Sequence, residues 1–354
     1  MQPSPLARYL FVAYVLLTVY ASLHPLTDWR GQGVPPLAFL VAPVPRYVTS
    51  FDVLANVLAY APLGFLAPLA CFPFLRGRGA VIAALALAVS LSTSLEVLQN
   101  FLPARIASNL DVAANAAGGL IGAVLGASYS GELLRDGGLP ALRYRLFLPG
   151  RRIDLGLVII GLWLVSQLNP GTLLFGTGDL RALLQGPSGE LHTPDVFIRV
   201  EAGVAGANTV AVGLLAAALV RSNQPVRSAV ILLLVTAFVF RTFAFGALFS
   251  GQDMLAWITP GALFGATAGT LVTIIAVALP RPGRLALSAV ALMAATALVN
   301  IAPGNPYLNA SLALWQQGHF MNFNGLTWIV SAVWPFCALV VLILLAGDDE
   351  RPGR

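Results

Sequence analysis

Apolar runs of about 20 residues recur along the whole chain, and they constrain its fold more than any other feature. At a rise of about 1.5 Å per residue, each run is long enough to cross a hydrocarbon core of about 30 Å as an α-helix. The runs are continuous, whereas the strands of a membrane barrel alternate. The composition agrees, because 58% of the residues are hydrophobic and only 10% are charged. We predict an all-α, polytopic transmembrane helical bundle.

About ten transmembrane helices can be drawn from these runs. We interpret the first as a retained helix, because no small-residue cleavage site separates it cleanly from the adjoining loop. The predicted segments are Leu6–Leu23, Phe51–Leu75, Ala80–Leu102, Leu110–Tyr129, Ile153–Leu168, Val200–Val220, Ser228–Phe249, Leu255–Leu279, Leu285–Ile301 and Leu326–Ala346. Pro62 lies inside the second segment and is expected to kink it and to free a carbonyl group.

A polar stretch with five arginines divides the chain between the fourth and fifth segments. We predict a four-helix membrane domain at residues 1–130, a cytoplasmic, arginine-rich linker at 131–152, and a six-helix membrane domain at 153–354.

The arginines also predict the topology. With the N-terminus in the cytoplasm, fourteen of the 20 basic residues, all arginine, fall on the cytoplasmic side, five fall outside, and Arg241 lies within a segment. This alternation follows the positive-inside rule and predicts that both termini are cytoplasmic. A nucleic-acid partner is not expected, since no basic patch with a binding motif is present. Cys71 and Cys337 lack metal-site spacing, so we expect neither a metal nor a cofactor.

Polar side chains gather at one end of the second, third and fourth segments. Each segment carries a pair or trio at three- or four-residue spacing, so its members share a helix face. The topology places all of them, with an arginine of the connecting loop, at the outer face of the membrane. The set comprises Asp52, Asn56, Glu96, Gln99, Arg105, Asp111 and Asn115.

Two interpretations of this set remain open. The residues can cap helix ends and bind one another, as Asp does in a first helical turn. Alternatively they form a binding site, because ionisable groups at membrane depth require partners. Arg105 would then neutralise a carboxylate or hold an anionic substrate. Gly118, Gly122 and Gly126 recur at four-residue spacing and predict close helix packing.

The order of these residues, with Pro62-Leu63-Gly64-Phe65 and Leu102-Pro103 between them, resembles the VanZ-like family over about residues 8–128. That family is a four-helix membrane unit named after an accessory protein of teicoplanin resistance. The resemblance implies a bacterial cytoplasmic membrane protein of the cell envelope, with a link to antibiotic resistance. It implies no catalytic residues.

The second bundle offers weaker candidates. Arg241 is expected to face the bundle interior, with Glu201 and Asp253 as candidate partners. His319 lies in the last outer loop, and a single His without an i+4 partner is a poor metal signal. The stretch Asp179–Leu191 is expected to form a short external element.

Three functions are compatible with these features. The polar set can bind a lipid-linked or cell-wall precursor, and in an enzyme Glu96 or Asp111 would be the acid or base. Paired carboxylates can also hold a divalent cation. The chain can instead be a transporter of a small or lipid-like solute, although no internal repeat is evident. It can also be a structural membrane protein with no chemistry. Membrane lipids are the partners common to all three.

Overall fold

The computed structural model describes residues 4–31, 33–43, 49–134, 138–181, 193–248, 254–303 and 321–349. The described chain is helical and divides into two compact units, residues 1–144 and 145–354. Eight of its helices are long and apolar enough to cross a membrane. This confirms the predicted all-α, multi-pass membrane architecture.

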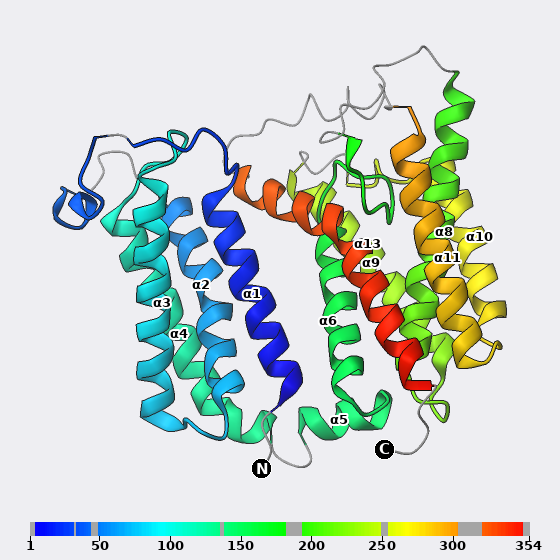
Figure 1. The fold of residues 1–354 in the computed structure, drawn as a ribbon, viewed down its shortest axis with the longest axis horizontal. Coiled ribbons are helices and arrows are strands. Elements are labelled where there is room, and N and C mark those ends of the chain that lie inside the picture. The colour runs from blue at the N-terminus through cyan, green and yellow to red at the C-terminus, as the bar shows by residue number, and fades with distance from the viewer. Residues whose placement is uncertain are drawn as a thin grey trace. The chain divides into compact units, whose positions relative to one another are not determined.

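In its described residues, the first unit is a bundle of four long helices accompanied by short helical elements (Figure 1). The elements are α1 (Pro5–Leu23), η1 (Ala38–Val41), α2 (Ser50–Cys71), α3 (Gly77–Gln99) and α4 (Asn109–Leu133), and α5 (Leu139–Leu146) crosses the boundary between the units.

Within its described residues, the second unit has six longer helices. They are α6 (Arg151–Ser166), α8 (Pro194–Leu219), α9 (Val226–Leu248), α10 (Pro260–Ala276), α11 (Arg281–Ile301) and α13 (Met321–Asp349). Each overlaps one predicted segment, so the estimate of about ten helices is confirmed. The helix predicted from Leu255 begins five residues later, because Thr259 caps its N-terminus and Pro260 occupies the first turn.

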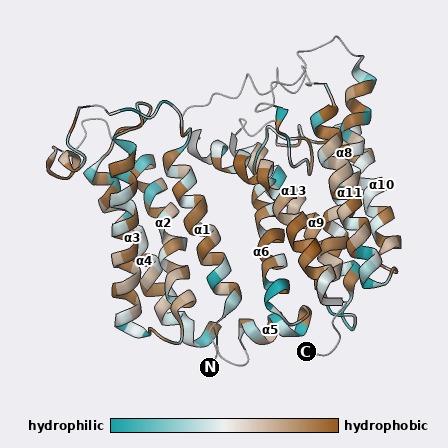
Figure 2. Cartoon of the chain, in the orientation of Figure 1, coloured by the Kyte–Doolittle hydropathy of each residue, from teal (hydrophilic) through white to brown (hydrophobic). Residues whose placement is uncertain are grey.

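The middle turns of the long helices are mostly apolar, and hydrophilic residues concentrate towards the helix ends (Figure 2). Large apolar side chains such as Leu16, Leu58 and Ile82 are exposed on their helices. In a soluble protein such a surface would aggregate, whereas in a bilayer it faces lipid.

Glycines bring α2 and α4 into close contact. A Cβ atom added at Gly118 would lie 2.2 Å from the carbonyl oxygen of Val57, and one added at Gly122 would lie 1.9 Å from that of Ala61. The close packing predicted from the glycine spacing is therefore confirmed. Helix α2 continues through Pro62, and the Tyr14 hydroxyl donates a 2.8 Å hydrogen bond to the carbonyl of Ala59 in the preceding turn.

Arginines gather at one end of each unit, where they bind the last turns of neighbouring helices. Arg8 donates to the carbonyl of Ala70 at the end of α2. In the second unit, Arg227, Arg281 and Arg284 donate to carbonyls at the ends of α10 and α8. Cations favour helix C-termini, whose last carbonyls lack partners within the helix.

Candidate functional site

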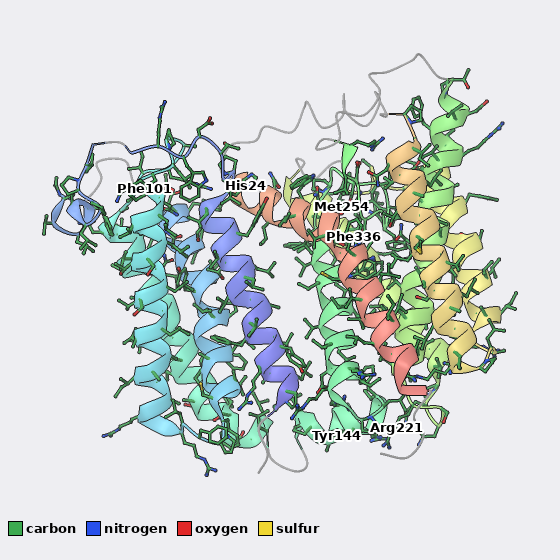
Figure 3. The ribbon with its side chains drawn as sticks, viewed as in Figure 1. His24, Phe101, Tyr144, Arg221, Met254 and Phe336 are labelled. Carbon is green, nitrogen blue, oxygen red and sulfur yellow. The ribbon has the colours of Figure 1, made fainter. Side chains whose placement is uncertain are left out.

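The predicted polar residues lie at the end of the first unit opposite Arg8. Figure 3 marks this end by His24, just after α1, and Phe101, just after α3. Helix α2 begins here, α3 ends here, and α4 begins here. Side chains from all three helices therefore approach the same region.

Asp52 caps the first turn of α2. Its carboxylate accepts hydrogen bonds from the Thr49 amide at 3.1 Å and the Thr49 hydroxyl at 2.7 Å, while its own amide donates to that hydroxyl at 3.2 Å. This reciprocal arrangement is a capping box. The capping role considered from the sequence therefore applies to Asp52, which also interacts electrostatically with Asp111.

Glu96 is the most deeply buried carboxylate of the set, with an exposed fraction of 3%. Its Oε2 atom accepts a 2.9 Å hydrogen bond from the Ser108 amide. The Ser108 hydroxyl caps α4 by accepting from the Leu110 amide. Arg105 attracts the Glu96 carboxylate electrostatically, whereas Asp111 repels it. The last turn of α3 is thus fixed to the first turn of α4, where the helix dipole favours a negative charge.

Further polar contacts join α2, α3 and α4. The Asn56 side chain of α2 interacts with the Asp111 carboxylate of α4. Asn115 of α4 donates from Nδ2 to the Ser92 hydroxyl of α3 at 2.9 Å, and Ser92 also interacts with the Tyr60 side chain of α2. Asn115 is 5% exposed, and its Oδ1 atom is buried without a hydrogen-bond partner among the described residues. Such an atom is an acceptor for a polar ligand or a water molecule.

Tyr60 and Ser92 belong to this network but were not predicted from the sequence. Each is four residues from a predicted member of the site, Tyr60 after Asn56 and Ser92 before Glu96, so each shares its helix face. Extending the same four-residue spacing by one turn along α2 and α3 would have found both.

Arg105 lies on the loop between α3 and α4 and binds the end of α1. Its Nε and Nη2 atoms donate to the His24 carbonyl at 3.0 and 2.5 Å. Burial lowers the pKa of Arg105, although Glu96 opposes this shift, and burial together with Arg105 lowers the pKa of His24. Gln99 makes a parallel link, since its Nε2 atom donates to the Ser22 carbonyl at 2.9 Å.

The loop after α1 is fastened beside these residues. Asn100 donates to the Pro36 carbonyl at 2.8 Å, and Asn109 donates to the Ala42 carbonyl at 2.7 Å. The Arg30 amide donates to the Phe101 carbonyl at 2.9 Å. Carboxamides at the ends of α3 and α4 therefore hold this loop at the same end of the unit as the polar side chains.

Within the described ranges, no three His, Cys, Asp or Glu side chains lie close enough together to hold a metal ion.

Arg241 of the second unit is buried, as predicted, with an exposed fraction of 2%. Among the described residues, its guanidinium donates to the carbonyls of Asn169 and Thr172 and to the Thr172 hydroxyl. The guanidinium lies over the Phe245 ring at 5.1 Å, and Glu201 interacts with it electrostatically. Arg241 therefore anchors main-chain carbonyls, with Glu201 as a charged neighbour. The other candidate partner, Asp253, lies outside the described residues, as does His319.

Those carbonyls belong to a buried segment without helical structure, residues 167–180, which we call the irregular segment. Other polar groups hold it in place: the Gly178 amide donates to the Ser331 carbonyl at 2.8 Å, and Asn300 donates to the Gly178 carbonyl at 2.6 Å. Arg241 lies seven residues before the end of α9, about 10 Å along the helix. The irregular segment therefore passes beside α9. Non-helical backbone at membrane depth is tolerated there because it is buried within the protein, away from lipid.

Residues 179–191 were predicted to form an external element. Of these, the structure describes Asp179, Leu180 and Arg181. Arg181 forms a 2.6 Å ion pair with Asp179 and donates to the carbonyls of Ala302 and Pro303 after α11. The described part of this element is thus bound to the end of α11.

The fold and this geometry define a class: a multi-pass helical membrane protein with a polar cluster at one end of its first bundle. Residues 9–129 match the VanZ/LLP1 family. The chain therefore carries an N-terminal VanZ-like domain, which confirms the resemblance seen in the sequence. Searches for similar curated proteins and for similar solved structures found no match.

Proposed function

We propose that this VanZ-like membrane protein binds the polar part of a lipid-linked or cell-wall precursor at the outer face of the bacterial cytoplasmic membrane. The observation that carries the proposal is the approach of polar side chains from α2, α3 and α4 to one end of the first unit. They are Asn56, Glu96, Arg105, Asp111 and Asn115. The family match supports a role linked to glycopeptide susceptibility, teicoplanin in particular.

The chemistry of the cluster suits such a ligand. Glu96 and Asp111 are acceptors for the hydroxyl and amide donors of sugars and peptides, and Asn115 has a buried acceptor atom without a described partner. Arg105 supplies the positive charge, and a guanidinium matches the geometry of a phosphate. A lipid-linked precursor carries its phosphate in the lipid headgroup region and its sugar or peptide donors next to that phosphate. It would therefore present the phosphate and these donors together at the membrane depth of the polar cluster.

The proposed orientation follows from charge. Arg8 and the turn that joins α2 to α3 lie at the opposite end of the unit from Glu96. Positive residues accumulate on the cytoplasmic side of membrane proteins, so the polar cluster would face outwards and both termini would be cytoplasmic.

The test is direct binding of a purified lipid-linked cell-wall precursor to the detergent-solubilised full chain, measured by native mass spectrometry. Glu96→Gln keeps an acceptor for the Ser108 amide but removes the charge, and we expect it to weaken binding at least tenfold. Glu132→Gln removes an exposed carboxylate near the other end of α4 and should leave binding unchanged.

Equal binding by the wild type and Glu96→Gln would contradict the proposed site. If Glu96→Gln and Arg105→Met bind normally and only lower the amount of folded protein, the cluster serves packing. Teicoplanin susceptibility of cells that produce each variant at equal protein levels then tests whether binding matters for the phenotype.

A transporter of a small or lipid-like solute is the second candidate, and two observations in the second unit favour it. Broken backbone at membrane depth, as in the irregular segment, is common in transporters. A cavity of about 370 Å³ also lies beside it, lined almost entirely by apolar atoms from residues that include Leu174, Phe238, Trp257 and Ala266. Solute uptake into proteoliposomes that contain the full chain would support this function over binding alone.

A further inference from the structure

Arginine and phenylalanine side chains gather around the turn between α2 and α3. This turn lies at the other end of these helices from the polar cluster. Arg8 at the start of α1 donates from Nε to the Ala70 carbonyl at 3.2 Å, and its guanidinium lies 5.9 Å from the centre of the Phe74 ring. Arg76 donates from Nε to the Pro73 carbonyl at 3.0 Å. Its guanidinium lies 5.1 Å from the centre of the Phe72 ring. Each of the two guanidinium groups is thus held beside this turn by one backbone carbonyl and one phenylalanine ring.

This arrangement leaves the outer edge of each guanidinium for another molecule. Both arginines use Nε for the backbone carbonyl, and no described residue accepts a hydrogen bond from their terminal nitrogens. Arg78 is exposed in the first turn of α3, and residues 70–80 contain no acidic side chain that could neutralise the charge. The turn is therefore a positively charged surface that an anion can approach.

The neighbouring apolar side chains indicate what kind of anion fits. Phe74 is 74% exposed and Leu75 is 41% exposed, although they lie beside the charged groups. A soluble anion gains nothing from such side chains. An anionic phospholipid supplies both a phosphate for the arginines and acyl carbon atoms for Phe74 and Leu75.

We infer that Arg8, Arg76 and the exposed Phe74 form a binding site for the phosphate headgroup of an anionic phospholipid. The two Nε hydrogen bonds and the two rings fix the guanidinium planes, so that their terminal nitrogens form the phosphate contacts. Phe74 inserts among the acyl chains next to the bound headgroup. This site is separate from the polar cluster and does not depend on what that cluster binds.

Titration of the purified full chain with phosphatidylglycerol and phosphatidylcholine, followed by native mass spectrometry, tests the site. The wild type should bind phosphatidylglycerol more tightly than phosphatidylcholine. The double variant Arg8→Gln/Arg76→Gln should lose about 25-fold in phosphatidylglycerol affinity, at about fivefold per arginine, with little change for phosphatidylcholine. The matched control is Arg30→Gln, an exposed arginine on the loop after α1, which should bind as the wild type does.

Several outcomes would overturn the inference. They are equal affinity for the two lipids, an unchanged affinity in the double variant, and an equal loss in the Arg30→Gln control. Displacement of the lipid by millimolar inorganic phosphate would show that the site takes free phosphate instead. If the double variant does not fold, Arg76→Gln alone decides, because Arg76 binds only its own turn; an expected loss of about fivefold supports the site and no loss refutes it.

Discussion

Replacing Gly122 by alanine should force α2 and α4 apart and destabilise the first unit. The added Cβ would lie 1.9 Å from the carbonyl oxygen of Ala61 and 2.7 Å from the amide nitrogen of Phe65. Even a close C–H···O contact keeps carbon and oxygen about 3.3 Å apart, so the helices must separate locally by about 1.4 Å. The obstacle is backbone rather than a flexible side chain, and no rotamer change can relieve it.

We expect the cost to be that of an overpacked core, about 1–3 kcal/mol. For a unit of this size, each kcal/mol corresponds to about 2–4 °C in the thermal midpoint. The same displacement would move Asn56 on α2 away from Asp111 on α4, because both helices carry site residues. Binding at the polar cluster should therefore weaken together with stability.

The assay is thermal unfolding of the detergent-solubilised chain, followed by size-exclusion chromatography after heating. Gly79→Ala is the matched control, since a Cβ added at this helical glycine meets nothing within 4 Å. It should leave the midpoint unchanged or raise it, because alanine is favoured over glycine in a helix by about 0.5–1 kcal/mol. A Gly122→Ala midpoint equal to that of the wild type would refute the packing argument.

Three further predictions concern polar and ionisable side chains. Glu96→Ala leaves the Ser108 amide without its acceptor, so stability should fall by about 1–3 kcal/mol while Glu96→Gln loses less; equal midpoints for the two variants would contradict this. Arg241→Met leaves two carbonyls of the irregular segment unpaired and should cost about 1–3 kcal/mol for each, visible as faster amide hydrogen exchange across residues 167–180. Burial and Arg105 lower the pKa of His24 in the folded chain. As the pH falls, His24 is therefore protonated in the unfolded chain before it is protonated in the folded chain. The stability of the fold should decline as the pH falls below 6.5, the ordinary pKa of histidine. His24→Gln should reduce that decline between pH 7 and 5, and an unchanged pH profile would exclude His24 as its source.

Much of the fold could be predicted because the bilayer imposes simple rules on the sequence. Apolar length predicted the long helices, and the glycine spacing predicted the close approach of α2 and α4. Helix ends were less predictable. Helix α2 ends at Cys71 rather than Leu75, because the residue before Pro73 is disfavoured in a helix.

The composition of the polar cluster could be predicted in part. The four-residue spacing identifies which side chains share a face, and Asn56, Asp111 and Glu96 do interact with groups on neighbouring helices. The backbone partners could not be foreseen, because the Ser108 amide and the His24 carbonyl carry no signal in the side-chain sequence.

The irregular segment could not be predicted either. Its sequence contains Pro and Gly and therefore resembles an external loop, and only tertiary contacts bury it. Those contacts come from distant residues, namely Arg241, Asn300 and Ser331. Arg241 was predicted to face inwards, but the buried main chain that it binds was not visible from local patterns.

Cysteine labelling in intact cells tests the outward orientation of the polar cluster most directly. After Cys71 and Cys337 are replaced by alanine, Ile106→Cys places a thiol at an 86% exposed position beside Arg105, and Gly79→Cys places one at the other end of α3. A membrane-impermeant maleimide should label position 106 in intact cells and position 79 only after the membrane is permeabilised. Labelling of position 79 but not position 106 in intact cells would place the cluster in the cytoplasm and contradict the proposed function.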